Sequence, residues 1–156
     1  MHIIEDTFTA SLDAVASSTA RLPHDVAAVR PLGDDELLAV QRTLADARRA
    51  IDACASLVAG EVVHRSRRDL GYDGLAQRTG FRTAEALVQH VTGSTGRDAA
   101  TPVKVGTMVH DAPDADLHEP WLSAVGAAVR AGTLAIDAAV AIRNGLGSPT
   151  ESVAAP

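Results

Sequence analysis

Apolar residues recur every seven positions along the middle of the chain, and a second apolar set falls between them. The first set is Leu37, Leu44, Ile51 and Val58, and the second is Val40, Ala47 and Cys54. A repeat of this kind keeps one face of a helix apolar, so it predicts a single long helix over residues 34–67. Gly33 and Glu36 suit the start of such a helix, where a glutamate completes a capping box. We expect Cys54 to be an inert core residue on the stripe.

The predicted helix is long for a chain of this size. At 1.5 Å per residue it extends about 50 Å, whereas a compact globule of 156 residues is about 40 Å across. The stripe therefore needs a partner, which is either a second helix of this chain or the same helix of a second copy. In a homodimer, Leu37, Leu44, Ile51 and Val58 would form the seam.

Shorter periodic segments flank this helix. Ile4, Phe8, Leu12 and Val15 predict a helix, and Pro23 and Pro31 leave room for one short helical turn between them. After a loop at 71–74, the predicted helices are 75–79, 83–91, part of 98–109 with Pro102 near its first turn or kinking it, 121–131 and 134–144. The pattern predicts an all-α fold, a helical bundle with one long central helix and short helical hairpins. We expect an N-terminal helical segment over 1–30, a helical domain over 31–148 and a truncated tail over 149–156.

Composition supports helices and narrows the class of protein. The chain holds 30 Ala but only four aromatic residues, and Ala is the best helix former. No apolar run is long enough to span a membrane, and the acidic N-terminus is unlike a signal peptide. One cysteine cannot form an internal disulfide. Because the sequence shows neither a spanning run nor a signal peptide, we expect a cytoplasmic protein without a membrane partner. Its net charge is -6.

Residues 75–86 have the outline of a helix-turn-helix. Ala76 is small where two helices would touch, Gly80 permits a sharp turn, and Leu75 and Phe81 would anchor the pair in the core. In a DNA-reading unit the second helix would present Arg82, Thr83, Glu85, Gln89 and His90. Residues 65–97 carry six Arg against three acidic residues, a local charge of +3. The alternative is a structural hairpin that binds nothing, because many helical hairpins share this glycine spacing.

A basic cluster follows the long helix, and it has two interpretations. Positive charge at this end stabilises the helix through its dipole, and the same arginines could clamp phosphates. The predicted DNA-binding set is Arg65, Arg67, Arg68, Arg78, Arg82, Thr83, Gln89 and His90.

Other polar segments carry no catalytic or metal-binding signature. The His and acidic residues of the segment 110–120 match no metal motif, so we expect a solvated acidic loop there. Ser94 or Thr95 suits a helix cap. No nucleophile elbow is present. We therefore expect no catalytic residue, no metal and no cofactor in this chain.

Three segments together resemble a known family. They are Leu32-Gly-Asp-Asp-Glu-Leu-Leu38, Ala76-Gln-Arg-Thr-Gly-Phe81 and Ala131-Gly-Thr-Leu-Ala135. Across residues 30–148 the chain resembles the domain of unknown function 222, the helical N-terminal region of actinobacterial proteins that end in an HNH endonuclease. The resemblance implies a non-catalytic helical accessory domain with a nuclease domain in cis, although Arg82 and Thr83 replace the Ser-Pro that often opens the second short helix.

Two functions from different classes follow from these observations. The first is an accessory domain that assists DNA engagement by an HNH-type nuclease, through the hairpin and the basic cluster. The alternative is a dimerisation or scaffold module that acts through the heptad-patterned helix.

Overall fold

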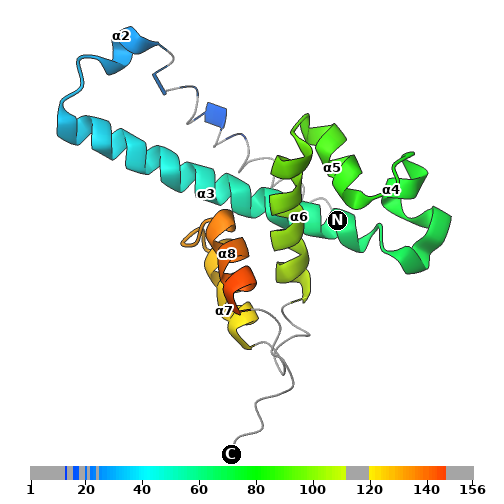
Figure 1. Ribbon diagram of the computed structural model, residues 1–156. Coiled ribbons are helices and arrows are strands. Elements are labelled where there is room, and N and C mark those ends of the chain that lie inside the picture. Colours follow the sequence, from blue (N-terminus) through cyan, green and yellow to red (C-terminus); the bar gives the residue numbers. More distant parts are fainter. Residues whose placement is uncertain are drawn as a thin grey trace, which may run out of the picture. The chain divides into compact units, whose positions relative to one another are not determined.

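The computed structural model describes residues 25–111 and 120–146, with isolated positions 13, 16, 17, 20, 22 and 23. The predicted helix over 4–15 falls almost entirely outside these residues, and the predicted tail over 149–156 lies wholly outside them. The chain forms two compact units, Met1–Ala47 and Arg48–Pro156. Its described residues are all-α and hold no strand, as predicted (Figure 1).

The elements follow the predicted order. They are α2 (Val26–Val29), α3 (Asp34–His64), the 3₁₀ segment η1 (Arg68–Asp73), α4 (Leu75–Arg78), α5 (Ala84–Thr92), α6 (Gly96–Asp111), α7 (Pro120–Arg130) and α8 (Ile136–Leu146). In the first unit, α2 is the expected single turn, capped by Asp25, whose carboxylate accepts from the Ala28 N–H at 2.7 Å. Before α3, the Gly33 N–H donates to Glu36 Oε2 at 3.0 Å, which is the expected capping-box contact.

The long helix ends at His64, three residues earlier than predicted. Ser66 N–H bonds to the Val63 carbonyl, and the chain is extended at Arg67. Two long-range bonds hold this turn: the Leu75 N–H donates to the Arg65 carbonyl at 2.7 Å, and the Ala76 N–H to Ser66 Oγ at 3.1 Å. Because these partners lie ten residues further along the chain, the local pattern did not reveal the end of the helix.

The packed face of α3 consists of small residues. Its buried positions are Ala53, Ser56, Ala59 and Gly60. At Gly60 the helix meets Gly106 of α6 so closely that a Cβ atom on Gly60 would lie 2.6 Å from the carbonyl carbon and oxygen of Gly106. A Cβ atom on Gly106 would overlap the Ser56 carbonyl oxygen. The buried Ser56 hydroxyl donates to the Asp52 carbonyl at 2.8 Å, so it needs no partner on α6.

The heptad stripe lies on another face of α3. Ile51 and Val58 are each two residues from a packed position, Ala53 or Gly60, which is about 200° around a helix. They are 45% and 53% exposed, and Leu37, in the first unit, is 44% exposed. These three residues therefore stay largely uncovered by the helices within the described ranges, while Leu44 is half-buried.

The expectation for Cys54 was wrong, because its side chain is exposed. Cys54 belongs to the heptad set rather than to the small-residue face, and the described part of the chain buries only the latter. The thiol therefore faces the side of α3 on which the large apolar residues remain exposed.

Helix α6 is the centre of the second unit, where it contacts α5, α7 and α8 (Figure 1). The buried core around it comprises Ala53, Val105, Met108, Val109, Leu122, Val125, Val129 and Ala139. Aliphatic and small side chains thus build the core. Arg49 of α3 adds a polar tie, since its Nε donates to the Gly132 carbonyl at 3.1 Å in the turn between α7 and α8.

Helix α6 is longer than predicted, and it includes two residues expected in the acidic loop, His110 and Asp111. Pro102 lies inside it, in the second turn rather than the first. Proline there removes one backbone hydrogen bond. The helix continues because residues on both sides of Pro102, including Ala99, Val103 and Val105, are buried against its neighbours. The rest of the predicted loop, 112–119, lies outside the described residues.

None of the helices within the described ranges is long and apolar enough to cross a membrane.

The glycine contact between α3 and α6 predicts a large effect of a single methyl group. Gly60→Ala should lower the free energy of unfolding by about 1–3 kcal/mol, because the rigid backbone of Gly106 occupies the space that the methyl group needs. Urea denaturation followed by circular dichroism measures this loss. Gly145→Ala is the matched control: it lies in α8 with nothing within 4 Å of the added atom and should raise stability by up to about 1 kcal/mol. Equal stability of the two variants would contradict the close packing.

Candidate nucleic-acid interface

The predicted hairpin forms, with its turn where the sequence placed it. Helices α4 and α5 lie within one residue of the predicted limits at each end. Ala76 is fully buried, and Gly80 has φ +87°, a conformation that L side chains rarely adopt. The Phe81 N–H donates to the Ala76 carbonyl at 2.8 Å and closes the turn. Leu75 and Phe81 are half-buried, so they anchor the hairpin less deeply than expected.

Helix α4 is a single turn, and side chains brace it. Gln77 Nε2 donates to the Arg82 carbonyl at 3.4 Å across the turn, and the Thr79 hydroxyl donates to the Leu75 carbonyl at 2.8 Å. Helix α4 contacts both η1 and α5, and α5 packs on α6. The elements that carry the candidate arginines are therefore successive neighbours within one unit.

The start of α5 is fixed by the residue that the family resemblance left in doubt. Thr83 is the N-cap, and its hydroxyl accepts from the Ala86 N–H at 3.2 Å. The helix ends at Gly93, which has the left-handed conformation usual for a helix terminus. Thr83 belongs to the predicted DNA-binding set, and its role in the structure is to cap α5 at the surface.

Two of the predicted arginines are paired with carboxylates. Arg65 Nε donates to Glu61 Oε1 at 2.5 Å, one turn earlier on α3. Arg67 Nε donates to Asp69 Oδ2 at 2.8 Å, and its Nη1 donates to the His64 carbonyl at 3.2 Å. These contacts hold the chain as it leaves α3. They support the interpretation in which the basic cluster has a local structural role.

The pairs shift the acidity of their carboxyl groups. The hydrogen bond from Arg65, together with its charge, holds the pKa of Glu61 below its ordinary value, and His64 and His110 add attraction. The hydrogen bond from Arg67 likewise lowers the pKa of Asp69. Asp69 is exposed and Glu61 is half-buried at the surface, so water screens both pairs and each contributes little to stability.

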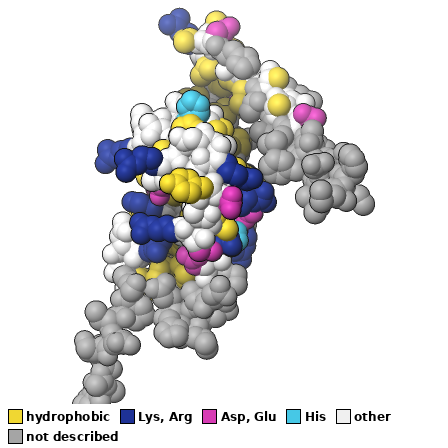
Figure 2. All heavy atoms as spheres, turned by 90° about the vertical axis from the view of Figure 1, so that its right-hand side faces the viewer, with side chains coloured by type: hydrophobic (Ala, Val, Ile, Leu, Met, Phe, Trp, Pro, Cys, Tyr) yellow, Lys and Arg dark blue, Asp and Glu magenta, His cyan; other side chains and the backbone are white. Residues whose placement is uncertain are grey.

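Three other predicted arginines are exposed and unpaired in the described part of the chain. Arg68 lies in η1, Arg78 at the end of α4 and Arg82 just before α5. None of them forms an ion pair or side-chain hydrogen bond with a described residue. Figure 2 looks onto the side on which α4 and η1 lie in Figure 1, and Lys and Arg side chains gather at several places on this face, with Asp and Glu side chains between some of them.

The remaining predicted residues lie on α5. Gln89 and His90 are both exposed. The His90 ring packs against the Phe81 ring, with 5.0 Å between centroids, so it also supports the turn. Arg82 lies before α5, seven residues ahead of Gln89. Extending the helical register of α5 back to Arg82 places the two residues on the same side of the helix.

One arginine and one tyrosine on these elements were not singled out by the sequence. Arg97 is exposed in the first turn of α6 and, within the described ranges, has no carboxylate partner. Arg97 contributes to the local charge of +3 over residues 65–97, and this charge is the sequence signal that could have identified it. Tyr72 in η1 is 94% exposed, and nothing in the spacing of residues 71–74 indicated this.

A second cluster of titratable groups joins α3 to α6 near their glycine contact. The His64 and His110 rings stack with centroids 6.0 Å apart, and His110 Nε2 lies 3.8 Å from Glu61 Oε2. Among the described residues, no three His, Cys, Asp or Glu side chains form a group that could hold a metal ion.

The chain matches no protein-family model, no curated protein and no solved structure.

The Glu61–Arg65 pair predicts a measurable pKa change. In Arg65→Gln the pKa of Glu61 should rise toward its ordinary value, because the guanidinium that stabilises the carboxylate is gone. The stabilisation from this pair is present above the unfolded-state pKa and is lost as the pH falls through the lower folded-state value. Carboxyl-detected NMR titration measures the shift. Arg68→Gln is the control, and a Glu61 pKa that moves equally in both variants would refute the pairing.

Proposed function

We propose that this chain is a non-catalytic helical module that engages duplex DNA through its phosphates. The observation that carries the proposal is a set of exposed arginines without a described carboxylate partner. They are Arg68 in η1, Arg78 in α4, Arg82 in the turn before α5 and Arg97 in α6. Cations that no carboxylate neutralises can replace the counterions of a phosphate backbone.

The turn geometry supports the same proposal. Phe81, His90 and the Thr83 cap hold the segment from Gly80 to the first turn of α5, so Arg82 is attached to a rigid backbone. Gln89 lies further along the exposed surface of α5. Phosphate contacts from the arginines would set the position of α5 on the duplex, and the exposed side chains of α5 would meet base edges.

The proposal also includes the domain with which this module would act. In the family that the sequence resembles, a helical region of this kind precedes an HNH nuclease domain, so chemistry on DNA would come from a domain in cis. A cytoplasmic location fits such a role. On this proposal Arg65 and Arg67 contribute less than Arg78 and Arg82, because Glu61 and Asp69 already neutralise them.

Charge reversal tests the DNA proposal. Binding of the chain to a labelled duplex, followed by fluorescence anisotropy, should weaken with salt with a log-log slope of about -3 to -5. The double variant Arg78→Glu, Arg82→Glu should lose binding by at least about tenfold at low salt, with a slope smaller by about 2.

The matched control is Arg42→Glu, Arg130→Glu, which changes the net charge equally at exposed positions outside the hairpin. It should bind almost as the original chain does. If the control loses as much affinity as the hairpin variant, overall charge rather than the hairpin governs binding. If the original chain fails to bind at low salt, the proposal fails.

The exposed heptad stripe supports a second function, self-association. Ile51 and Val58 remain about half exposed on a helix whose packed face lies elsewhere, and Leu37 is exposed to a similar degree. A 31-residue helix with a seven-residue apolar repeat is suited to pair with its own copy. In that dimer the seam would comprise Leu37, Leu44, Ile51 and Val58.

A charge placed in the seam tests this second function. Leu44→Asp, Ile51→Asp should abolish the dimer, because association would bury unpaired carboxylates, and it should leave DNA affinity per chain within about twofold. Sedimentation equilibrium measures the association. Leu38→Asp is the control, since Leu38 is 52% exposed and lies off the stripe. A chain that stays monomeric at all accessible concentrations rules out self-association.

A further inference from the structure

Tyr72 is an exposed aromatic side chain in the 3₁₀ segment η1. It is 94% exposed, whereas Phe81 and Trp121 are partly buried, the first against His90 and the second against the core cluster. Within the described part of the chain, Tyr72 contacts no other ring and its hydroxyl forms no hydrogen bond. Both faces of its ring are therefore open to a ligand, and an aromatic ring buries a large apolar surface when it is covered.

The backbone around Tyr72 is held in place, so the ring projects from a fixed turn. Residues 71–73 are exposed and form the tip of this turn. Gly71 has φ +52° and ψ -125°, a conformation that L side chains rarely adopt. The Leu75 N–H donates to the Arg65 carbonyl at 2.7 Å and ties the ends of the loop together. Covering the ring therefore costs less conformational entropy than it would in a free loop.

Arginines flank Tyr72 on both sides along the chain. Residues 65–82 hold five arginines and two aspartates, a local charge of +3. Arg68 lies four residues before Tyr72, so their Cα atoms are at most about 14 Å apart in any backbone conformation. Arg78 belongs to α4, which contacts η1. On the face shown in Figure 2, hydrophobic side chains lie between groups of Lys and Arg side chains.

The two aspartates leave the charge of this segment positive. Arg67 Nε already donates to Asp69 Oδ2 at 2.8 Å. Asp73 forms no ion pair with a described residue, but the unpaired Arg68 and Arg78 outnumber it. An exposed ring beside an excess of positive charge is the combination by which proteins hold unpaired nucleotides.

We propose that Tyr72 stacks on an unpaired nucleobase of the DNA that this module engages. Inside a duplex the faces of the bases are covered by their neighbours. Unless the duplex is unstacked, a protein ring can stack only on an unpaired or terminal base. Arg68 and Arg78 would bind phosphates of the same strand. The inference rests on the proposed DNA engagement, and it narrows the substrate to DNA with a single-stranded end or gap.

Two oligomers of equal charge isolate the contribution of the base. One is a fluorescently labelled oligothymidylate of about 12 nucleotides, and the other is the same sugar-phosphate chain without bases. In fluorescence anisotropy at low salt, the original chain should bind the first at least about fivefold more tightly. Tyr72→Ala should remove this difference. Tyr72→Phe should keep it to within about twofold, because the ring stacks without its hydroxyl.

A long blunt duplex separates this inference from the proposed function. Tyr72→Ala should bind the duplex within about twofold of the original chain, since phosphate contacts there come from the arginines. The matched control is Leu146→Ala, which removes another exposed side chain, from α8, and should change neither affinity. Circular dichroism should be the same for every variant, because the replaced side chains are exposed.

A second readout observes Tyr72 directly. It is the sole tyrosine of the sequence, so replacement by fluorotyrosine gives a single ¹⁹F signal. Oligothymidylate should move this signal saturably, because a base replaces water over the ring. The oligomer without bases should leave it in place.

Three results would overturn the inference. The first is equal affinity of the original chain for the two oligomers, and the second is an unchanged preference in Tyr72→Ala. The third is an equal loss of duplex affinity in Tyr72→Ala, which would mean that the ring wedges into paired DNA. If the duplex still binds in the first two cases, the phosphate proposal stands. If neither duplex nor oligomer binds at low salt, the proposed function and this inference fail together.

Discussion

The contact between Gly60 and Gly106 is the constraint on which the second unit depends. Their backbones lie too close for a Cβ atom on either residue, and the fully buried Ser56 lies one turn earlier on α3. Small residues at a helix crossing let dispersion contacts between backbones replace contacts between large side chains. Because α6 is also the helix against which α5, α7 and α8 pack, the crossing connects α3 to the core and, through α5, to the arginine-bearing hairpin.

Close packing on one face of α3 also determines which apolar side chains stay exposed on its other faces. The core uses the small residues of this helix, so its larger apolar side chains, Ile51 and Val58, stay about half exposed. A helix normally buries its largest apolar residues because they remove the most surface from water. In α3 the small residues are buried and the large apolar residues are exposed. This exposed apolar surface is the physical reason to test self-association as well as DNA engagement.

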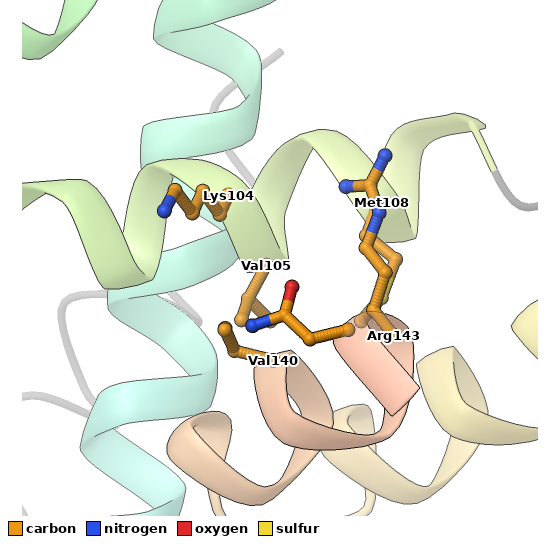
Figure 3. Close-up of a pocket in the computed structure, with 6 residues that line it drawn as sticks. Lys104, Val105, Met108, Val140 and Arg143 are labelled. Carbon is orange, nitrogen blue, oxygen red and sulfur yellow. The ribbon is translucent and has the colours of Figure 1, made fainter. Parts of the chain in front are cut away.

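The cations of the second unit differ in how they are neutralised. On the hairpin side, Arg65 and Arg67 are satisfied by Glu61 and Asp69, and the arginines beyond them have no described carboxylate partner. Between α6 and α8, Lys104 and Arg143 border a small surface cavity (Figure 3). An extended set of exposed charges without carboxylate partners suits a polyanion.

The sequence by itself determined the helical class, the order of the elements and the hairpin turn at Gly80, because helical spacing, caps and a positive φ at glycine are local properties. The tertiary structure decided which face of α3 packs, where α3 ends, and which arginines are paired. The heptad pattern is read from large apolar residues, so it pointed to Ile51 and Val58 and placed Cys54 in the core. The small-residue face of α3 becomes evident only when Gly106, 46 positions after Gly60, supplies the facing surface.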